Sequence, residues 1–196
     1  MARTLFYDTE TTDRWKFDKP STDVTQPHLV ELGLILEDDD DDGSDRVSLN
    51  LIIHPNGWEI SEEVSKIHGI THEAAVKLGV TLANACYIWR DLAMSADIIV
   101  AHNLDFDKRV ITKALRDGEV DDFDWGRVTE RCTMKAATNF VKAQKPNGRG
   151  YKWPNLTEAH TWATGEAFDG AHAALADVRA CRTVYHRLLR EGAFNA

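Results

Sequence analysis

Four carboxylates lie in three separated apolar segments of this 196-residue chain. Asp8 and Glu10 lie in TLFYDTETT, Asp107 lies in VAHNLDFDKRV, and Asp177 lies in GAHAALADVRA. A carboxylate among apolar residues is unfavourable unless it has a partner. Four acids brought to one point would repel one another unless divalent cations held them together. We therefore predict a fold that joins the three segments around a two-metal site of the type used in phosphoryl transfer.

The pattern of apolar runs predicts an α/β fold with a mixed central sheet. Five strands are expected, at residues 3–9, 28–37, 46–54, 97–101 and 127–133. The acidic turn DDDDDGSD joins the second and third of these strands and predicts a hairpin. Helices are expected as short pieces within 61–78 and at 82–95, 106–115, 134–143, 155–164 and 173–191.

Length and composition predict one domain covering residues 1–196. No apolar run approaches membrane-spanning length, so we expect no membrane partner. Because Met1 leads almost directly into a strand pattern, we expect no signal or transit peptide. The three scattered cysteines are interpreted as buried free thiols in a reducing compartment, which favours a cytoplasmic protein.

The net charge of −9 argues against sequence-blind coating of duplex DNA. The distribution of charge is uneven, however, because residues 131–152 carry six basic side chains and no acidic one. This stretch ends in Tyr151-Lys152-Trp153. Basic and aromatic residues together can hold a single strand through phosphate contacts and base stacking. A solvated, irregular loop is the equally weighted alternative.

Residue spacing predicts which acids face a common point. Asp8 and Glu10 are two apart on a strand, so their side chains lie on the same side, although a pair of exposed strand-end acids is common. On the helix after 97–101, Asp107 shares its face with Ile111 and Ala114. Asp105 lies about 200° away on a polar face, and we therefore select Asp107 as the metal ligand.

The third segment gives the sharpest signal. Asp177 lies on the apolar stripe of a predicted helix, together with Ala174, Cys181, Val184 and Leu188. His172 stands at the start of that helix, where it can act as a general base on a metal-bound water or simply cap the helix. His102 and Asn103, at the end of a strand, can bind substrate or brace the site.

The motifs FYDTETT, AHNxxFD and HxxxxD, in this order, resemble the DnaQ-like 3′–5′ exonucleases of the DEDDh branch of the RNase H-like superfamily. The phrase IHGIT at residues 67–71 resembles the substrate-binding loop of the same family. The resemblance extends from about residue 4 to residue 190. It implies an RNase H-like fold with a five-stranded mixed sheet flanked by helices.

The resemblance also implies roles for individual residues. Asp8, Glu10, Asp107 and Asp177 would hold two Mg²⁺ or Mn²⁺ ions, and His172 would take a proton from the attacking water. Substrate contacts would come from Thr9, Thr11, Thr12, His68 and Gly69. Phe106 would support the terminal base or the metal-bearing helix, with plain core packing as the alternative.

Two loops depart from the family pattern or vary within it. Asp13 stands where the family often has glycine, and the long loop 13–27 carries Trp15 and Phe17. This loop can cover a 3′ end and stack on bases, or it can pack on the surface. Together with the loop 142–152, it leaves substrate preference open.

The resulting hypothesis is a metal-dependent 3′–5′ exodeoxyribonuclease that releases 5′-mononucleotides from single-stranded or frayed 3′ ends, in proofreading, repair or phage DNA metabolism. The first alternative is an exoribonuclease of the same superfamily, although HGIT favours DNA. The second is a silent nucleic-acid-binding module, which the complete set of acids disfavours. Because few residues follow the last predicted helix, we expect a stand-alone enzyme or transient contact with a DNA polymerase.

Overall fold

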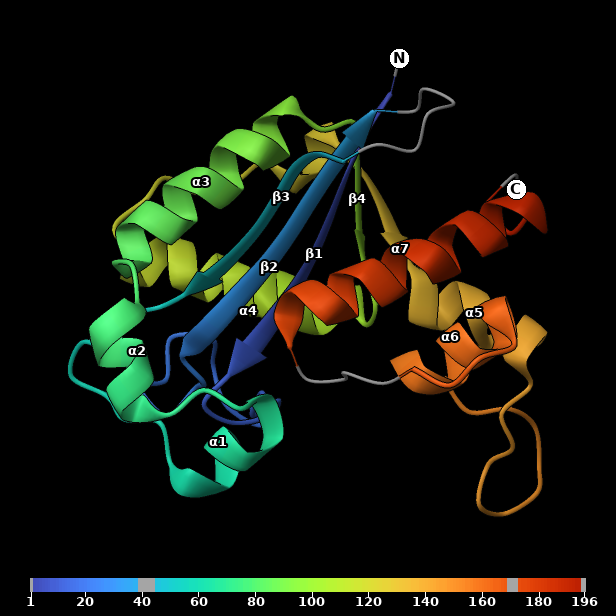
Figure 1. Ribbon diagram of the computed structural model, residues 1–196, viewed down its shortest axis with the longest axis horizontal. Helices are drawn as coiled ribbons and strands as arrows, with labels where there is room; N and C mark the ends of the chain where they lie inside the picture. The colour runs from blue at the N-terminus through green and yellow to red at the C-terminus, as the bar shows by residue number, and fades with distance from the viewer. Residues whose placement is uncertain (1, 39–44, 169–172, 195–196) are drawn as a thin grey trace.

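The computed structural model describes residues 2–38, 45–168 and 173–194, and its centre is a five-stranded sheet (Figure 1). The strands are β1 (Arg3–Thr11), β2 (Leu29–Asp38), β3 (Asp45–Ile52), β4 (Ile98–Ala101) and β5 (Thr129–Cys132). Their order across the sheet is β3-β2-β1-β4-β5. β2 runs antiparallel to both of its neighbours, β1 and β3, whereas β1, β4 and β5 run parallel to one another. The predicted mixed α/β sheet is therefore confirmed.

Helices cover both faces of the sheet. They are α1 (Glu62–His68), α2 (His72–Leu78), α3 (Leu82–Ser95), α4 (Leu104–Asp117), α5 (Thr133–Val141), α6 (Leu156–Thr164) and α7 (Ala174–Arg190). In Figure 1, α7 crosses the front of the sheet, while α3 and α4 lie behind it. α5 and α6 pack beside α7 and extend that layer. None of the helices in the described part of the chain is long and apolar enough to cross a membrane.

Strand alternation divides the core of β1 between the two faces. Leu5 and Tyr7 point toward α3 and α4, where the Tyr7 ring meets Trp89 edge to face. Phe6 points the other way and packs against Val178 and Tyr185 of α7. The same alternation then directs successive polar residues at the end of β1 to opposite faces.

Two sequence expectations differ from the structure in detail, and a third cannot be compared with it. The third strand ends at Ile52 rather than at residue 54, and Ile53 forms an isolated bridge to Val80 while its amide still donates to the Val30 carbonyl of β2 at 2.9 Å. Cys132 is only partly buried, since it ends the edge strand β5, although all three cysteines are free. The predicted acidic turn falls mainly on residues 39–44, which lie outside the described residues.

The segment 142–152, for which an irregular loop was one of two predicted alternatives, is folded back on itself. The Lys152 amide donates to the Ala143 carbonyl at 2.8 Å, and the Lys145 amide donates to the Gly150 carbonyl at 3.2 Å. A bridge between Gln144 and Tyr151 completes the pairing. We call residues 142–152 the basic hairpin.

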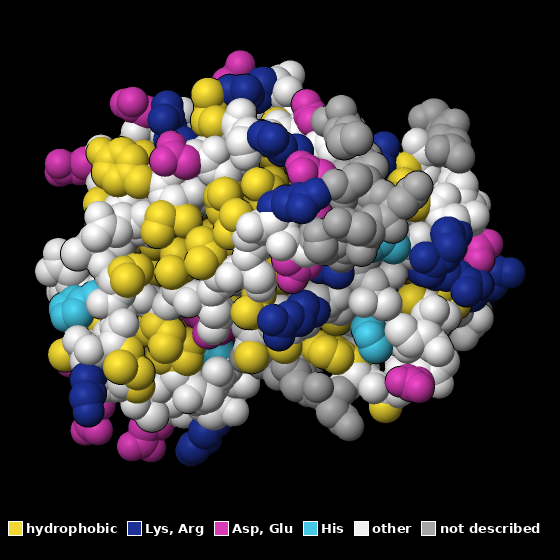
Figure 2. Space-filling view, turned by 45° about the horizontal axis from the view of Figure 1, so that its top comes forward, with side chains coloured by type: hydrophobic (Ala, Val, Ile, Leu, Met, Phe, Trp, Pro, Cys, Tyr) yellow, Lys and Arg dark blue, Asp and Glu magenta, His cyan; other side chains and the backbone are white. Residues whose placement is uncertain are grey.

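The other edge of the sheet is more apolar. Val47, Leu49 and Leu51 of β3 are half-buried and pack beside α3 against the core. Figure 2 shows hydrophobic side chains gathered on the part of the surface formed by β3 and α3. The basic and apolar surfaces therefore lie at opposite edges of the sheet.

Candidate active site

The candidate site lies at the end of β1, between the sheet and the first turns of α4 and α7. Because β1 and β4 are parallel, their carboxyl ends meet at one edge, with Phe6 paired to Val100. α4 begins at Leu104, only three residues after β4 ends. The topology thus brings the DTE segment of β1 to the N-terminal turn of α4.

Gly33 brings α7 to the same place. It pairs with Asp8 across the β1–β2 ladder. A Cβ atom at Gly33 would lie 2.5 Å from the carbonyl carbon of Ala174, so any larger residue would clash with the backbone of α7. Asp177 follows Ala174 by three residues, which is one helical turn. The absence of a side chain at Gly33 therefore allows the first turn of α7 to approach the sheet closely, which brings Asp177 near Asp8.

Three of the four predicted acids converge on one point. Carboxylate oxygens of Asp8, Glu10 and Asp177 all lie within 4.8 Å of one another. Asp177 is buried, whereas Asp8 and Glu10 are partly buried. As the spacing predicted, Asp177 shares the buried stripe of α7 with Ala174, Cys181, Val184 and Leu188.

Burial and the neighbouring charges raise the pKa values of Asp8 and Glu10. For Glu10, burial is the main cause and the charges of Asp177 and Glu31 add to it, which raises the pKa to about 7. Burial, followed by the charges of Asp107, Asp177, Glu10 and Glu31, raises the pKa of Asp8 well above its usual value. Ionising the whole cluster near neutral pH therefore requires a compensating positive charge.

Asp107 approaches from α4, on the face of the sheet opposite to α7, and within the described residues it is held, unlike Asp8 and Glu10, by hydrogen bonds to its side chain from the protein. It is buried on α4, and Thr9 donates to its Oδ1 atom from both the hydroxyl, at 2.8 Å, and the backbone amide, at 3.2 Å. Burial raises the pKa of Asp107 to about 8, while the two bonds from Thr9 oppose that rise. Asp107 is not part of the trio within 4.8 Å, although its charge is a leading influence on Asp8.

The predicted orientations of Asp105 and Asp107 agree with the structure, while the role of Asp107 as a metal ligand stays a prediction. Asp105 is exposed and its Oδ2 atom lies 2.5 Å from Nζ of Lys135. Ile111 and Ala114 share the buried face of α4 with Asp107, as predicted.

A fifth carboxylate, Glu31, was missed by the sequence reasoning. It is buried on β2, directly across the ladder from Glu10. Its Oε2 atom accepts from the Ala174 amide at 2.9 Å, and its Oε1 atom accepts from Asn50 at 2.8 Å. Glu31 therefore ties the first turn of α7 to the sheet. The only available signal was an acid within the apolar run HLVELGLIL.

Several predicted substrate contacts are engaged within the protein. Thr9 holds Asp107, Thr11 donates to the Asp13 carbonyl at 2.7 Å, and Thr12 accepts from the His28 amide at 3.0 Å. His68 is buried and its Nδ1 atom accepts from the Ile70 amide at 3.1 Å. Gly69 ends α1 with a φ of 78°, a conformation that favours glycine.

His102 braces the site, which is one of its two predicted roles. The Pro154 carbonyl can only accept, so Nε2 of His102 donates to it at 3.1 Å. Nδ1 then accepts from the Thr133 hydroxyl at 2.9 Å. Burial lowers the pKa of His102 to about 4, which keeps the ring neutral. With both ring nitrogens occupied, the geometry does not support the predicted contact with substrate.

The remaining predicted residues take different positions. Asn103 immediately precedes α4 with a φ of 77°, and its side chain does not cap the helix, whereas Phe106 is partly buried and packs against the main core. The packing of Phe106 agrees with the alternative given above. His172, the predicted general base, lies outside the described residues.

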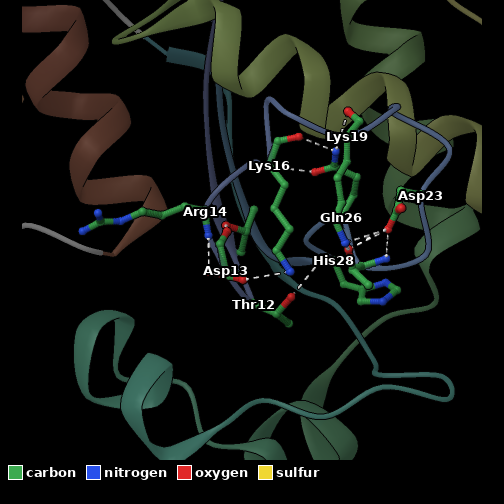
Figure 3. A network of polar contacts seen from close by, with 10 residues as sticks. Thr12, Asp13, Arg14, Lys16, Lys19, Asp23, Gln26 and His28 are labelled. Atoms are coloured by element: carbon green, nitrogen blue, oxygen red, sulfur yellow. Dashed lines mark hydrogen bonds and ion pairs between the residues drawn. The ribbon is translucent and has the colours of Figure 1, made fainter.

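The loop 13–27 packs on the surface of the protein, which is one of its two predicted arrangements. Figure 3 shows its polar network, centred on the buried side chain of Gln26. This amide accepts from the Lys16 amide at 3.0 Å and donates to the Lys16 carbonyl at 2.8 Å. Trp15 is buried in the core, whereas Phe17 is exposed beneath the guanidinium of Arg109. Arg14 points away from the network in Figure 3.

The chemistry of the cluster fits a hard divalent cation. Carboxylate oxygens are the ligands that Mg²⁺ prefers, and Mn²⁺ accepts the same set. Asp8 and Glu10 receive no side-chain hydrogen bond within the described residues, so their oxygens are available as ligands. The cluster can therefore hold at least one cation through Asp8, Glu10 and Asp177, with Asp107 adjoining it.

Comparison with known proteins points to nucleases. No family model matches the chain. The chain is 28% identical to an uncharacterized exonuclease, CP81, of Escherichia phage 186, over 96% of this chain and 89% of the relative.

Solved structures of exonuclease I share the fold. The chain matches Escherichia coli exonuclease I in complex with a dT13 oligonucleotide with a TM-score of 0.75, at 18% identity over 97% of its length. It matches exonuclease I from Methylocaldum szegediense with a TM-score of 0.71, at 23% identity over 97% of its length. The chain spans 41% of each of these proteins. These matches establish that the chain has the fold of part of exonuclease I.

Proposed function

We propose that the chain is a metal-dependent 3′–5′ exodeoxyribonuclease that releases 5′-mononucleotides from single-stranded or frayed 3′ ends. The observation that carries this proposal is the cluster of Asp8, Glu10 and Asp177 within 4.8 Å of one another. Its acids are costly to ionise without a cation, and phosphodiester hydrolysis is a reaction for which such cation sites are suited.

The comparisons support DNA as the substrate. The phage relative is named as an exonuclease, and exonuclease I has been solved with dT13 and dA16 oligonucleotides. One E. coli exonuclease I–single-stranded DNA structure is a zinc-bound form, which supports the use of a divalent metal. The 3′–5′ direction and the DEDDh assignment rest on the sequence motifs.

Asp8, Glu10, Asp107 and Asp177 would hold two Mg²⁺ or Mn²⁺ ions. When bound, the ions would supply positive charge for the phosphoryl group and the leaving 3′ oxygen, and would acidify the attacking water. This neutralisation would also allow the clustered acids to remain ionised at neutral pH.

The other residues would position these ligands and move the proton. Thr9 would keep Asp107 aimed at the cluster, and Glu31 would hold the first turn of α7 at the sheet. His172 would accept the proton of the attacking water. This role is inferred from the HxxxxD spacing to Asp177.

The proposal can be tested with matched 5′-labelled single-stranded DNA and RNA oligonucleotides in Mg²⁺, Mn²⁺ or EDTA. We expect a DNA ladder that shortens from the 3′ end, with no shortening in EDTA or in Asp8→Asn. His172→Ala should lower the rate by roughly 10²–10⁴-fold, the usual effect of losing a general base.

The same assay separates the alternatives. Faster shortening of RNA would replace the proposal with an exoribonuclease. Binding of DNA and RNA without shortening of either would favour the silent module. Full activity of His172→Ala would contradict the DEDDh assignment.

A further inference from the structure

Trp153 is an exposed aromatic side chain on a fixed stretch of backbone. The residue is 61% exposed, although tryptophan is highly buried on average. The next residue, Pro154, is buried, and Asn155 caps α6 with a reciprocal bond to Glu158. On the other side, the amide of Lys152, the last residue of the basic hairpin, donates to the Ala143 carbonyl at 2.8 Å. The indole is therefore presented to solvent from an ordered position.

A series of side-chain contacts connects this position to the acidic site. The Pro154 carbonyl accepts from His102, which directly follows β4. Nζ of Lys135 lies 6.0 Å from the centre of the Trp153 ring and 2.5 Å from Oδ2 of Asp105. Asp105 precedes Asp107 by two residues on α4. Trp153 thus borders the same end of α4 that carries a candidate metal ligand.

The neighbouring basic hairpin offers cations to a polyanion. Lys142, Lys145 and Arg149 are exposed and have no acidic partner within salt-bridge distance among the described residues. Figure 1 shows the hairpin projecting at the end of the molecule where β1 finishes. In a chain of net charge −9, this local excess of positive charge attracts anionic groups such as phosphates.

We propose that Trp153 stacks on a base of single-stranded DNA whose 3′ end lies in the acidic site, and that the basic hairpin contacts phosphates of the same strand. This inference rests on the proposed function and adds the path of the substrate. An exposed indole beside cations is the combination that holds single strands without sequence preference. Bases in a duplex are stacked on one another, so a blunt duplex cannot use this platform.

The test measures the binding of fluorescein-labelled dT16 by anisotropy in EDTA, which prevents cleavage. Trp153→Ala should weaken binding by about 5- to 150-fold, the range found for loss of one base–aromatic stack. Trp153→Phe should retain most of the affinity because it keeps a ring. Tyr87→Ala, which removes a half-exposed ring from α3, should bind like the wild type. Circular dichroism would verify that each variant is folded.

Salt dependence tests the hairpin separately. The triple variant Lys142→Ala/Lys145→Ala/Arg149→Ala should reduce the slope of log affinity against log salt by about 2, since each phosphate contact on a single strand contributes about 0.7. Binding of a blunt duplex should be unaffected by Trp153→Ala.

Two outcomes would overturn the inference. One is wild-type affinity of Trp153→Ala for dT16, and the other is an equal loss of affinity in Tyr87→Ala. A dinucleotide is too short to reach beyond the acidic site, so its turnover tests the proposed exonuclease activity separately from strand binding at Trp153. If the wild type binds dT16 through Trp153 but hydrolyses neither substrate, the path of the strand stands and the exonuclease proposal fails.

Discussion

The carboxylates on the two faces of β1 differ in the hydrogen bonds that they accept from the protein. On the face toward α7, Asp8 and Glu10 meet Asp177, and the described residues donate no side-chain hydrogen bond to Asp8 or Glu10. On the face toward α4, Asp107 accepts two bonds from the intervening Thr9. The strand thus supplies donors to one acid while crowding the others.

This difference indicates that Asp107 and the acids facing α7 are held in place by different means. Donors from the protein fix Asp107 before any cation binds. The acids facing α7 repel one another and require a counter-charge, which makes their arrangement dependent on a cation. Substitutions on the two faces should therefore have distinguishable effects on turnover and on stability.

The largest effect is expected on the face toward α7. Asp177→Asn keeps the shape of the side chain but removes a charged ligand, so turnover should be abolished in the oligonucleotide assay. The metal-free protein should become more thermostable because one of several like charges is removed. Asp105→Asn, an exposed change on α4, is the matched control and should retain turnover. Unchanged turnover of Asp177→Asn would show that the trio is not the reaction centre.

A smaller effect is expected on the face toward α4. Thr9→Val removes the hydroxyl donor to Asp107 at nearly constant volume but leaves the backbone donor. Loss of such a supporting bond typically lowers metal affinity or activity by about 10–100-fold. Thr9→Ser restores the hydroxyl and should recover most of the rate. Equal rates for the valine and serine variants would mean that the hydroxyl does not position Asp107.

Gly33 links the sheet to the acid on α7. Gly33→Ala would place a methyl group 2.5 Å from the Ala174 backbone, so α7 must move. Overpacking of this kind costs about 1–3 kcal/mol, which thermal unfolding would detect together with a fall in turnover. Gly126→Ala, where the nearest atom belongs to the side chain of Asp124, should be nearly neutral. A neutral Gly33→Ala would contradict the close approach of α7.

The raised pKa values predict an inverted pH dependence of stability without metal. The folded pKa is about 7 for Glu10 and about 8 for Asp107, both above the usual range for carboxyl groups in unfolded chains. Folding therefore favours the protonated forms, and this stabilisation is lost as pH rises from about 4.5 to 8. Unfolding in EDTA should reveal a loss of about 1–3 kcal/mol over this window. Mg²⁺ should reverse it, and a flat profile would contradict the crowding.

Local patterns in the sequence predicted much of this arrangement. Helical periodicity separated Asp107 from Asp105 and placed Asp177 on a buried stripe, because these inferences depend only on neighbours within one element. The sequence did not indicate the roles of Glu31 and Gly33. Both depend on contact with Ala174 of α7, which follows them by 143 and 141 residues respectively. Thr9 was predicted to contact substrate. Its hydrogen bond to Asp107 joins residues 98 positions apart, so local sequence patterns did not reveal it.

The two aromatic loops illustrate the same limit. The loop 13–27 contains Trp15, and the loop 142–152 is followed by Trp153, with basic residues close to each tryptophan. The sequence alone did not show which of the two rings is exposed. In the structure, Trp15 is buried while Trp153 is exposed. The anchors differ, because the buried amide of Gln26 organises the first loop and backbone pairing organises the second.

Calorimetric titration of Mn²⁺ into the metal-free protein would examine the cation site itself, without dependence on substrate. We predict saturable binding to the wild type, loss of binding or a large loss of affinity in Asp8→Asn and Asp177→Asn, and weakened binding in Thr9→Val. Asp105→Asn should bind Mn²⁺ like the wild type. Equal stoichiometry and affinity in the wild type and Asp8→Asn would contradict a cation held by the acids between β1 and α7.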